Sequence, residues 1–248
     1  MINKMSALFI LLFSATFNIL FAQELITDRP DYTESAITVP ARSVQIETGF
    51  EYVNQNNTIS TSFPNSLFRI GLYSSVELRI GFTGWTWAKL SDERDLYFND
   101  LIVESKIQLT DKKAEIPLAI ILAGTIPVGD DAVSSGGSDY GIKLAGSYDF
   151  SENAGIGINA GVYSLFDGAG RQLMAVASMS YGISLDENFA AYFETFAEMP
   201  QNESWSPVFD SGITFSLTQL SQLDLYAGFG LNSIAPDFLI GTGYSVRF

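Results

Sequence analysis

The chain has 248 residues, with 13 Lys and Arg against 28 Asp and Glu, and it contains neither Cys nor His. Because phosphate binding requires clusters of Lys and Arg, this acidic balance argues against a nucleic-acid partner. The missing Cys and His exclude disulfides, thiolate metal sites and Ser-His-Asp hydrolases, which leaves only carboxylate chemistry open. We therefore expect no enzymatic activity, no metal and no cofactor.

The first segment is an apolar run at residues 5–21, shorter than the roughly 20 residues that a membrane-spanning helix needs. Lys4 precedes the run and Ala22-Gln23-Glu24 follows it. These flanks favour a cleaved secretory signal peptide over an uncleaved anchor, although Leu20 is larger than the residue preferred near such a cut. We expect residues 1–22 to be the signal peptide and residues 23–42, broken by Pro30 and Pro40, to be a periplasmic segment before the first strand.

From residue 43 onward, segments of about ten residues alternate between apolar and polar side chains, which is the period of a β-strand. Repetition of such segments is typical of membrane barrels. The fifth and ninth segments are the least regular, because apolar residues fall on both parities. The twelve segments are residues 43–53, 68–72, 76–83, 100–109, 116–127, 142–150, 155–162, 172–181, 189–196, 209–217, 223–230 and 237–248.

The connectors between these segments alternate between short and long. Short ones are expected at residues 74–75, 110–115, 151–153, 184–188 and 218–222, and longer ones at 54–65, 85–99, 128–138, 166–171, 199–206 and 232–236. Bacterial barrels have even strand numbers, short periplasmic turns and longer outer loops. Residues 43–248 are therefore predicted to form an all-β, closed antiparallel transmembrane β-barrel of about twelve strands. A soluble β-sandwich is the alternative, but it would not need this alternation of connectors.

The last strand ends on Phe248. It resembles the closing strand of bacterial outer-membrane barrels, whose terminus is read by the barrel-assembly machinery. That resemblance implies the assembly machinery and outer-membrane lipid as partners, and the cell outer membrane of a Gram-negative bacterium as the location. Because free sheet edges are not tolerated in hydrocarbon, residues 43–53 and 237–248 should lie side by side.

A more specific resemblance lies in Asp28-Arg29-Pro30-Asp31, Thr33-Glu34-Ser35, Val39-Pro40 and Gln45-Ile46-Glu47-Thr48-Gly49-Phe50. Residues 27–50 resemble the opening of the outer-membrane family named for the meta-pathway of phenol degradation, whose members are described as transporters. The resemblance implies a channel for small compounds, aromatic or hydrophobic ones among them. The alternative is a non-transporting barrel that senses or braces the envelope.

If the apolar parity of each strand faces lipid, the other parity faces the lumen, where it places nine acids and five bases. One hypothesis is that these charges pair across the barrel, since unpaired buried charges are unfavourable. The other is a polar conduit that disfavours anions. The residues assigned to the lumen are Glu47, Glu51, Arg69, Glu77, Arg79, Asp100, Glu104, Lys106, Lys143, Asp149, Glu194, Asp210, Asp224 and Arg247.

The stretch Asp28-Arg29-Pro30-Asp31, with Glu34 shortly after it, also has two interpretations. Arg29 could pair with neighbouring carboxylates and pin the chain where it enters the first strand, with the prolines stiffening it. Alternatively, the segment could fold into the periplasmic mouth of the barrel and gate it.

Two of the expected outer connectors have a distinctive composition. Residues 129–139 are rich in Gly, Ser and Asp, but they lack the ligand spacing and terminal Glu of an EF-hand, so we expect a mobile polar loop. Trp85, Trp87 and Tyr97 lie near expected strand ends. Because aromatic girdles mark both rims of such barrels, we expect these three residues to be interface anchors.

Overall fold

The computed structural model describes residues 25–56, 58–90 and 93–248, so the expected signal peptide lies outside the described residues. No helix among the described residues is long and apolar enough to cross a membrane. The strands are β1 (Val44–Gln55), β2 (Thr58–Tyr73), β3 (Val76–Phe82), β4 (Trp85–Leu90), β5 (Glu93–Phe98), β6 (Leu101–Gln108), β7 (Leu118–Ile126), β8 (Tyr140–Ser151), β9 (Ala154–Phe166), β10 (Arg171–Ser184), β11 (Phe189–Pro200), β12 (Ser206–Thr218), β13 (Ser221–Gly230) and β14 (Phe238–Arg247).

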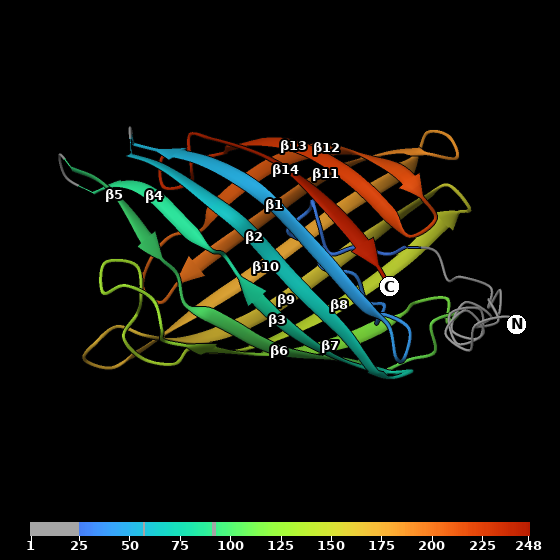
Figure 1. The fold of residues 1–248 in the computed structure, drawn as a ribbon, viewed down its shortest axis with the longest axis horizontal. Helices are drawn as coiled ribbons and strands as arrows, with labels where there is room; N and C mark the ends of the chain where they lie inside the picture. Colours follow the sequence, from blue (N-terminus) through green and yellow to red (C-terminus); the bar gives the residue numbers. More distant parts are fainter. Residues whose placement is uncertain (1–24, 57, 91–92) are drawn as a thin grey trace, which may run out of the picture.

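These strands form one antiparallel sheet that closes on itself, because β1 pairs with both β2 and β14 (Figure 1). Twelve strands make up the closed ring: β1 to β3 and β6 to β14. The hairpin of β4 and β5 lies outside the ring and continues from the first half of β2. The predicted twelve-stranded closed barrel is therefore confirmed.

The closing seam joins the first and last strands in regular register, from Gln45 opposite Arg247 to Asn54 opposite Phe238. At its end, the N–H of Val44 donates to the carbonyl of Phe248 at 3.2 Å, and the N–H of Phe248 donates to the carbonyl of Val44 at 2.8 Å. This pairing satisfies the backbone groups that an open edge would leave exposed to lipid. The expected contact between the two ends of the sheet is confirmed.

Two connectors predicted as outer loops are largely strand. Residues 54–65 contain only a tight turn, since β2 already begins at Thr58, and residues 85–99 form the β4–β5 hairpin. The Ser- and Thr-rich start of β2 lacks apolar alternation, and Pro64 suggested a break. Pro64 instead lies at a β-bulge, where the pairing of β2 with β1 shifts its register between Gly49 and Glu51. A strand tolerates proline at such a position. The fifth predicted strand also begins later, at Leu118.

The barrel wall is apolar outside and polar inside. Along β14, for example, Phe238, Ile240 and Tyr244 are exposed, whereas Ser245 and Arg247 on the other parity are buried or nearly so. Arg69, Arg79 and Lys106 are among the largest fully buried side chains. Such an inside-out arrangement fits a barrel whose outer surface contacts hydrocarbon and whose interior is polar.

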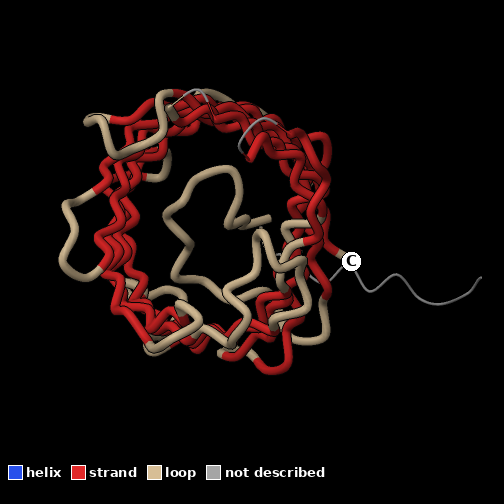
Figure 2. The backbone as a smooth tube through the Cα atoms, turned by 90° about the vertical axis from the view of Figure 1, so that its left-hand side faces the viewer, coloured by secondary structure: helices blue, strands red, loops and turns tan. Residues whose placement is uncertain are grey.

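Residues 25–42, which the sequence analysis assigned to a periplasmic segment, lie inside the ring of strands. Figure 2 shows irregular chain within the barrel cross-section. Hydrogen bonds tie this N-terminal segment to wall strands as far apart as β1, β6, β9 and β11. β1 begins and β14 ends near the end of the barrel that carries the short turns, which is the short-turn end. The opposite end is the long-loop end.

The seam register can be tested with cysteines, because the native chain has none. Thr48 and Tyr244 are directly opposite on β1 and β14. Directly paired positions hold their Cβ atoms about 4.5–5.5 Å apart, whereas diagonal ones are about 7–8 Å apart. We expect Thr48→Cys with Tyr244→Cys to cross-link on oxidation, as shown by altered gel mobility. The control pair, Thr48→Cys with Thr242→Cys, should cross-link far less; equal yields would contradict the register.

Candidate functional site

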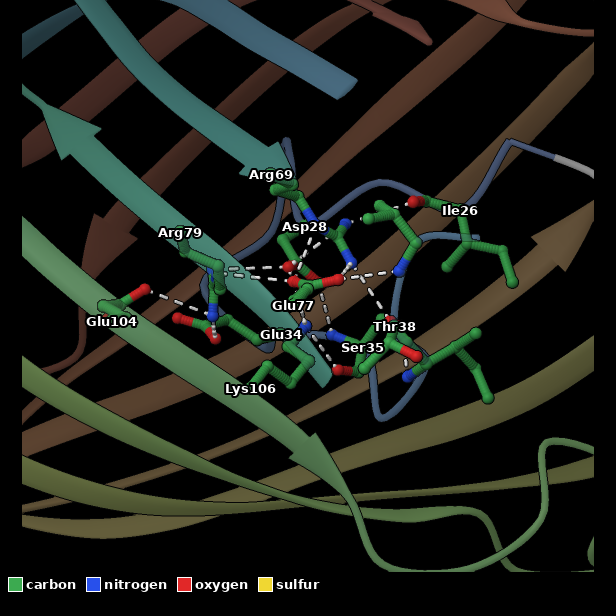
Figure 3. A network of polar contacts seen from close by, with 12 residues as sticks. Ile26, Asp28, Glu34, Ser35, Thr38, Arg69, Glu77, Arg79, Glu104 and Lys106 are labelled. Carbon is green, nitrogen blue, oxygen red and sulfur yellow. Dashed lines mark hydrogen bonds and ion pairs between the residues drawn. The ribbon is translucent and has the colours of Figure 1, made fainter. Parts of the chain in front are cut away.

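The centre of the ion-pair network is Asp28, a buried carboxylate on the N-terminal segment (Figure 3). Its Oδ2 lies 2.8 Å from Lys106 Nζ, 3.2 Å from Arg69 Nη1 and 3.3 Å from Arg79 Nη2. Burial alone would raise the pKa of Asp28, but these three cations hold it below its usual value. The other carboxylate oxygen accepts the N–H of Ser35 at 2.8 Å, which folds the segment back on itself.

Two wall carboxylates bind both the wall cations and the backbone of the segment. Glu47 Oε1 and Glu77 Oε1 each lie 3.0 Å from Arg69. Glu47 Oε2 accepts the N–H groups of Asp28 and Arg29, both at 2.9 Å. Glu77 Oε2 accepts the N–H of Val39 at 2.7 Å. Since buried polar groups need partners, the irregular segment is held by the side chains of the wall in place of a β-ladder.

A second acid of the segment, Glu34, lies between two further cations. Its carboxylate pairs with Arg79 and with Lys143 Nζ, the latter at 3.0 Å. Burial would raise the pKa of Glu34, but Arg79 and Lys143 hold it well below its usual range. The amide of Asn159 on β9 completes the contact, since it accepts the N–H of Glu34 at 2.8 Å and donates to its carbonyl at 2.9 Å.

Arg29 crosses the closing seam. Its Nη2 lies 3.1 Å from Asp224 Oδ1 on β13, and its guanidinium carbon lies 5.8 Å from the centre of the Tyr226 ring. Gly49 on β1 and Gly243 on β14 face each other beneath it, and a Cβ at either position would lie only 2.5 Å from the guanidinium. The two glycines therefore form a niche for Arg29. Its partner is far away in the sequence, and the hypothesis of pairing with a neighbouring carboxylate does not describe this contact.

On the opposite wall, Glu194 of β11 binds the segment at Tyr32 and Thr33. It accepts both backbone N–H groups at 2.6 Å and also the hydroxyl of Thr33. The ring of Tyr32 stacks on Phe196, with 4.4 Å between centroids. Beside this contact lies Asp31, whose pKa is raised well above its usual range by burial and by the Glu194 carboxylate. Burial and Glu194 therefore favour the protonated form of Asp31, whereas the cations around Asp28 favour its carboxylate.

The remaining residues assigned to the lumen are distributed over both ends of the barrel. Glu104 pairs with Arg79 at 3.2 Å, Glu51 accepts the Tyr226 hydroxyl at 2.7 Å, and Asp210 accepts the Tyr192 hydroxyl at 3.3 Å. Arg247 is buried, and Asp149 is exposed at the short-turn end.

Asp100 does not belong to the lumen. Its carboxylate accepts hydrogen bonds from Gly129 N–H at 2.8 Å and Ser134 Oγ at 2.9 Å, and so holds the loop after β7. Within that loop, Asp130 accepts the N–H of Phe98 at 2.7 Å. Across the described residues, no group of three or more acidic side chains is arranged to hold a metal ion. Asp100 thus holds the backbone of the acidic loop, and Asp130 of the loop in turn holds the end of β5.

Several residues of the site were not assigned to the lumen from the sequence. Gln45, Asn159 and Ser178 lie on the inward parity but carry no charge, so a search limited to charged residues passed over them. Tyr32 and Thr33 lie in a segment without periodicity, where nothing in the sequence indicates which side chain meets which strand.

The wall opposite the ion pairs carries small side chains, which leave an open space between this wall and the N-terminal segment. An open vestibule of about 600 Å³ lies between the N-terminal segment and strands β8 to β12, at the short-turn end. Its wall includes Ser147, Gly155, Gly157, Ser180 and Gly182. Long charged side chains therefore fill one half of the lumen, while small residues keep part of the other half free.

Comparison with known proteins agrees with this architecture. A family model described as "Putative MetA-pathway of phenol degradation" matches residues 27–248. The chain belongs to this family. The resemblance found in the sequence is thereby confirmed. No curated protein shows significant sequence similarity to the chain.

Several outer-membrane proteins of known structure share this fold. An outer membrane channel from Pseudomonas putida F1 has a TM-score of 0.67 and 15% identity, over 90% of this chain and 100% of that one. The NanC porin has a TM-score of 0.59 and 12% identity, over 83% and 100% of the two chains. The KdgM porin has a TM-score of 0.57 and 9% identity, over 82% and 99%. At these identities the likeness concerns the fold.

The two aspartates of the family stretch should differ in their response to the same substitution. Ala36 on the segment is buried, so the labelling rate of Ala36→Cys by a soluble thiol reagent reports release of the segment. Asp28→Asn should accelerate labelling about tenfold or more, because the three cations around Asp28 would lose the negative charge that pairs with them. Asp31→Asn should leave labelling near the parent rate, because burial and Glu194 already favour the protonated, uncharged form of Asp31. An acceleration by Asp31→Asn as large as that by Asp28→Asn would contradict the assigned electrostatics.

The glycine niche gives a second test of how the segment is held. Gly243→Ala should displace Arg29 and accelerate labelling of Ala36→Cys, because the added Cβ would lie 2.5 Å from the guanidinium. Gly182→Ala is the matched control, since its Cβ would meet nothing within 4 Å. If both variants labelled at the parent rate, Arg29 would not depend on the niche.

Proposed function

We propose that this protein is an outer-membrane channel for small solutes, in which the solute passes between the N-terminal segment and the small-residue wall. The observation that carries the proposal is the unequal lumen. Ion pairs tie the segment to β2, β3 and β6 on one side, while the vestibule of about 600 Å³ borders β8 to β12 on the other. A barrel whose interior served only as bracing would have no need of that space.

The similarity of the fold to solved channels and porins supports the same function. Twelve-stranded barrels are wider than the eight-stranded kind that side chains fill and narrower than sixteen-stranded porins. The solved structures of the same fold include a channel and two porins. For this chain we accordingly propose an outer-membrane location after cleavage of residues 1–22, with both ends of the barrel chain in the periplasm and the assembly machinery recognising the strand that ends at Phe248.

The chemistry of the lumen favours small cationic or neutral solutes with an apolar part. The vestibule is bordered by Asp31, Glu34, Asp149 and Glu152 against two bases. A wall with surplus negative charge raises the local concentration of cations. Further along, β11 to β14 contribute an inward apolar cluster that suits the aromatic or hydrophobic compounds implied by the family; its buried members are Tyr192, Val208, Tyr226, Ala235 and Leu239.

Conductance in planar bilayers tests the proposal. We expect a channel that prefers potassium to chloride, with the preference weakening in high salt, because the Debye length falls from about 30 Å at 0.01 M to about 3 Å at 1 M. Asp149→Asn with Glu152→Gln should lower the preference, since both acids border the vestibule and neither is an ion-pair partner of the segment. Glu47 and Glu77 are left unchanged, because they hold the segment.

Glu187→Gln is the matched control. Glu187 is an exposed acid of another short turn at the same end of the barrel, and it does not border the vestibule. This variant should keep the parent selectivity. Anion preference would refute the electrostatic assignment, and a folded barrel with neither conductance nor solute flux would favour the bracing function.

A further inference from the structure

The β4–β5 hairpin is the one part of the sheet that the ring does not include. It extends the first half of β2 beyond the long-loop end of the barrel, where Figure 1 shows it projecting to the left. β4 pairs with β2 from Phe63 opposite Trp85 to Ser60 opposite Ala88. Among the described strands β5 pairs with β4 alone, which leaves its other edge unpaired there.

The two faces of this hairpin differ sharply. Residues directly opposite each other in an antiparallel sheet share a face. One face therefore carries Phe63, Trp85 and Phe98 in one row and Trp87 and Leu96 in the next. The exposed fractions are 50% for Phe63, 43% for Trp85, 50% for Trp87 and 47% for Leu96.

The other face is polar. It carries Ser62 and Thr86, whose hydroxyls are 3.0 Å apart, and the amide of Asn99 donates to the Thr86 hydroxyl at 2.8 Å. Tyr97 lies opposite Thr86 and therefore on this face. Tyr97 thus differs from Trp85 and Trp87, although the sequence analysis grouped all three as interface anchors.

The apolar face of the hairpin continues the outer face of the barrel. Phe82 on β3 has the outward parity of Leu78 and Ile80. Its ring lies 6.1 Å from the ring of Trp85 and 5.3 Å from that of Phe98. The row of apolar side chains that faces lipid along β3 therefore passes into the hairpin without a polar gap.

We propose that the apolar face of the β4–β5 hairpin lies against the outer leaflet of the membrane and anchors the long-loop end there. Exposed apolar faces of this kind mark contact surfaces, and Trp prefers the boundary between headgroups and acyl chains. Lipid is the occupant because the face is continuous with the lipid-facing wall. A second copy added at the free edge is opposed by the exposed Asp95 on that edge strand, since edge charges block strand pairing. The inference rests on the outer-membrane location proposed above.

Fluorescence quenching in vesicles tests this placement. The chain has three Trp residues, so Trp85→Phe, Trp87→Phe and Trp205→Phe together give a Trp-free background. Leu96→Trp and Tyr97→Trp in this background are adjacent probes on opposite faces of β5. In phosphatidylcholine vesicles with brominated acyl chains, we expect Leu96→Trp to be quenched at least twofold more than Tyr97→Trp. Aqueous acrylamide should quench them in the reverse order.

A third probe separates this proposal from the membrane location on which it depends. Phe193→Trp lies on the outer face of β11, where Phe193 is 51% exposed. Quenching of Phe193→Trp by brominated chains without quenching of Leu96→Trp would overturn the hairpin proposal alone. If neither were quenched, the membrane barrel itself would be refuted. Protection of Leu96→Trp from both quenchers, growing with the protein-to-lipid ratio, would identify a second copy as the occupant and also overturn the proposal.

Discussion

The interior of this barrel depends on one constraint: a charge removed from water needs an opposite charge beside it. In the described part of the wall, Arg69, Arg79, Lys106 and Lys143 lie together with three close carboxylates, those of Glu47, Glu77 and Glu104. The N-terminal segment supplies the missing negative charge through Asp28 and Glu34. The segment is therefore an integral part of the folded interior, as a hydrophobic core would be in a soluble protein.

This constraint also explains the two-sided lumen. Ion pairs are compact and directional, so they draw the segment toward the strands that carry long charged side chains. On the far side, the contacts are fewer and are concentrated at Tyr32 and Thr33, where Glu194 binds backbone N–H groups. The vestibule lies beside small residues of β8 to β10 at the short-turn end, whereas Lys143 and Asn159 of the same strands contact the segment at Glu34. Charge distribution along the sequence thus determines where space remains for a solute.

Much of this could be predicted from the sequence, because strand alternation is a local property. The parity of each strand separated Arg69 and Glu77 from their lipid-facing neighbours, and the alternating connectors indicated a closed ring. The path of residues 25–42 could not be predicted, since an aperiodic segment with two prolines carries no signal for the strands it will contact. Arg29 and Asp224 are 195 positions apart. The β4–β5 hairpin was missed for a different reason: its polar face and its Ser- and Thr-rich partner strand have the composition of a loop.

Arg29 in its glycine niche has a consequence for the order of assembly. The niche exists only where β1 and β14 meet, and the residue that fills it precedes β1 in the chain. The first segment to be synthesised after the expected signal peptide thus occupies a place that the last strand completes. Either the segment is already inside when β14 reaches β1, or it must enter a finished ring from the short-turn end. In both cases a larger side chain at Gly49 or Gly243 would require a smaller one at position 29.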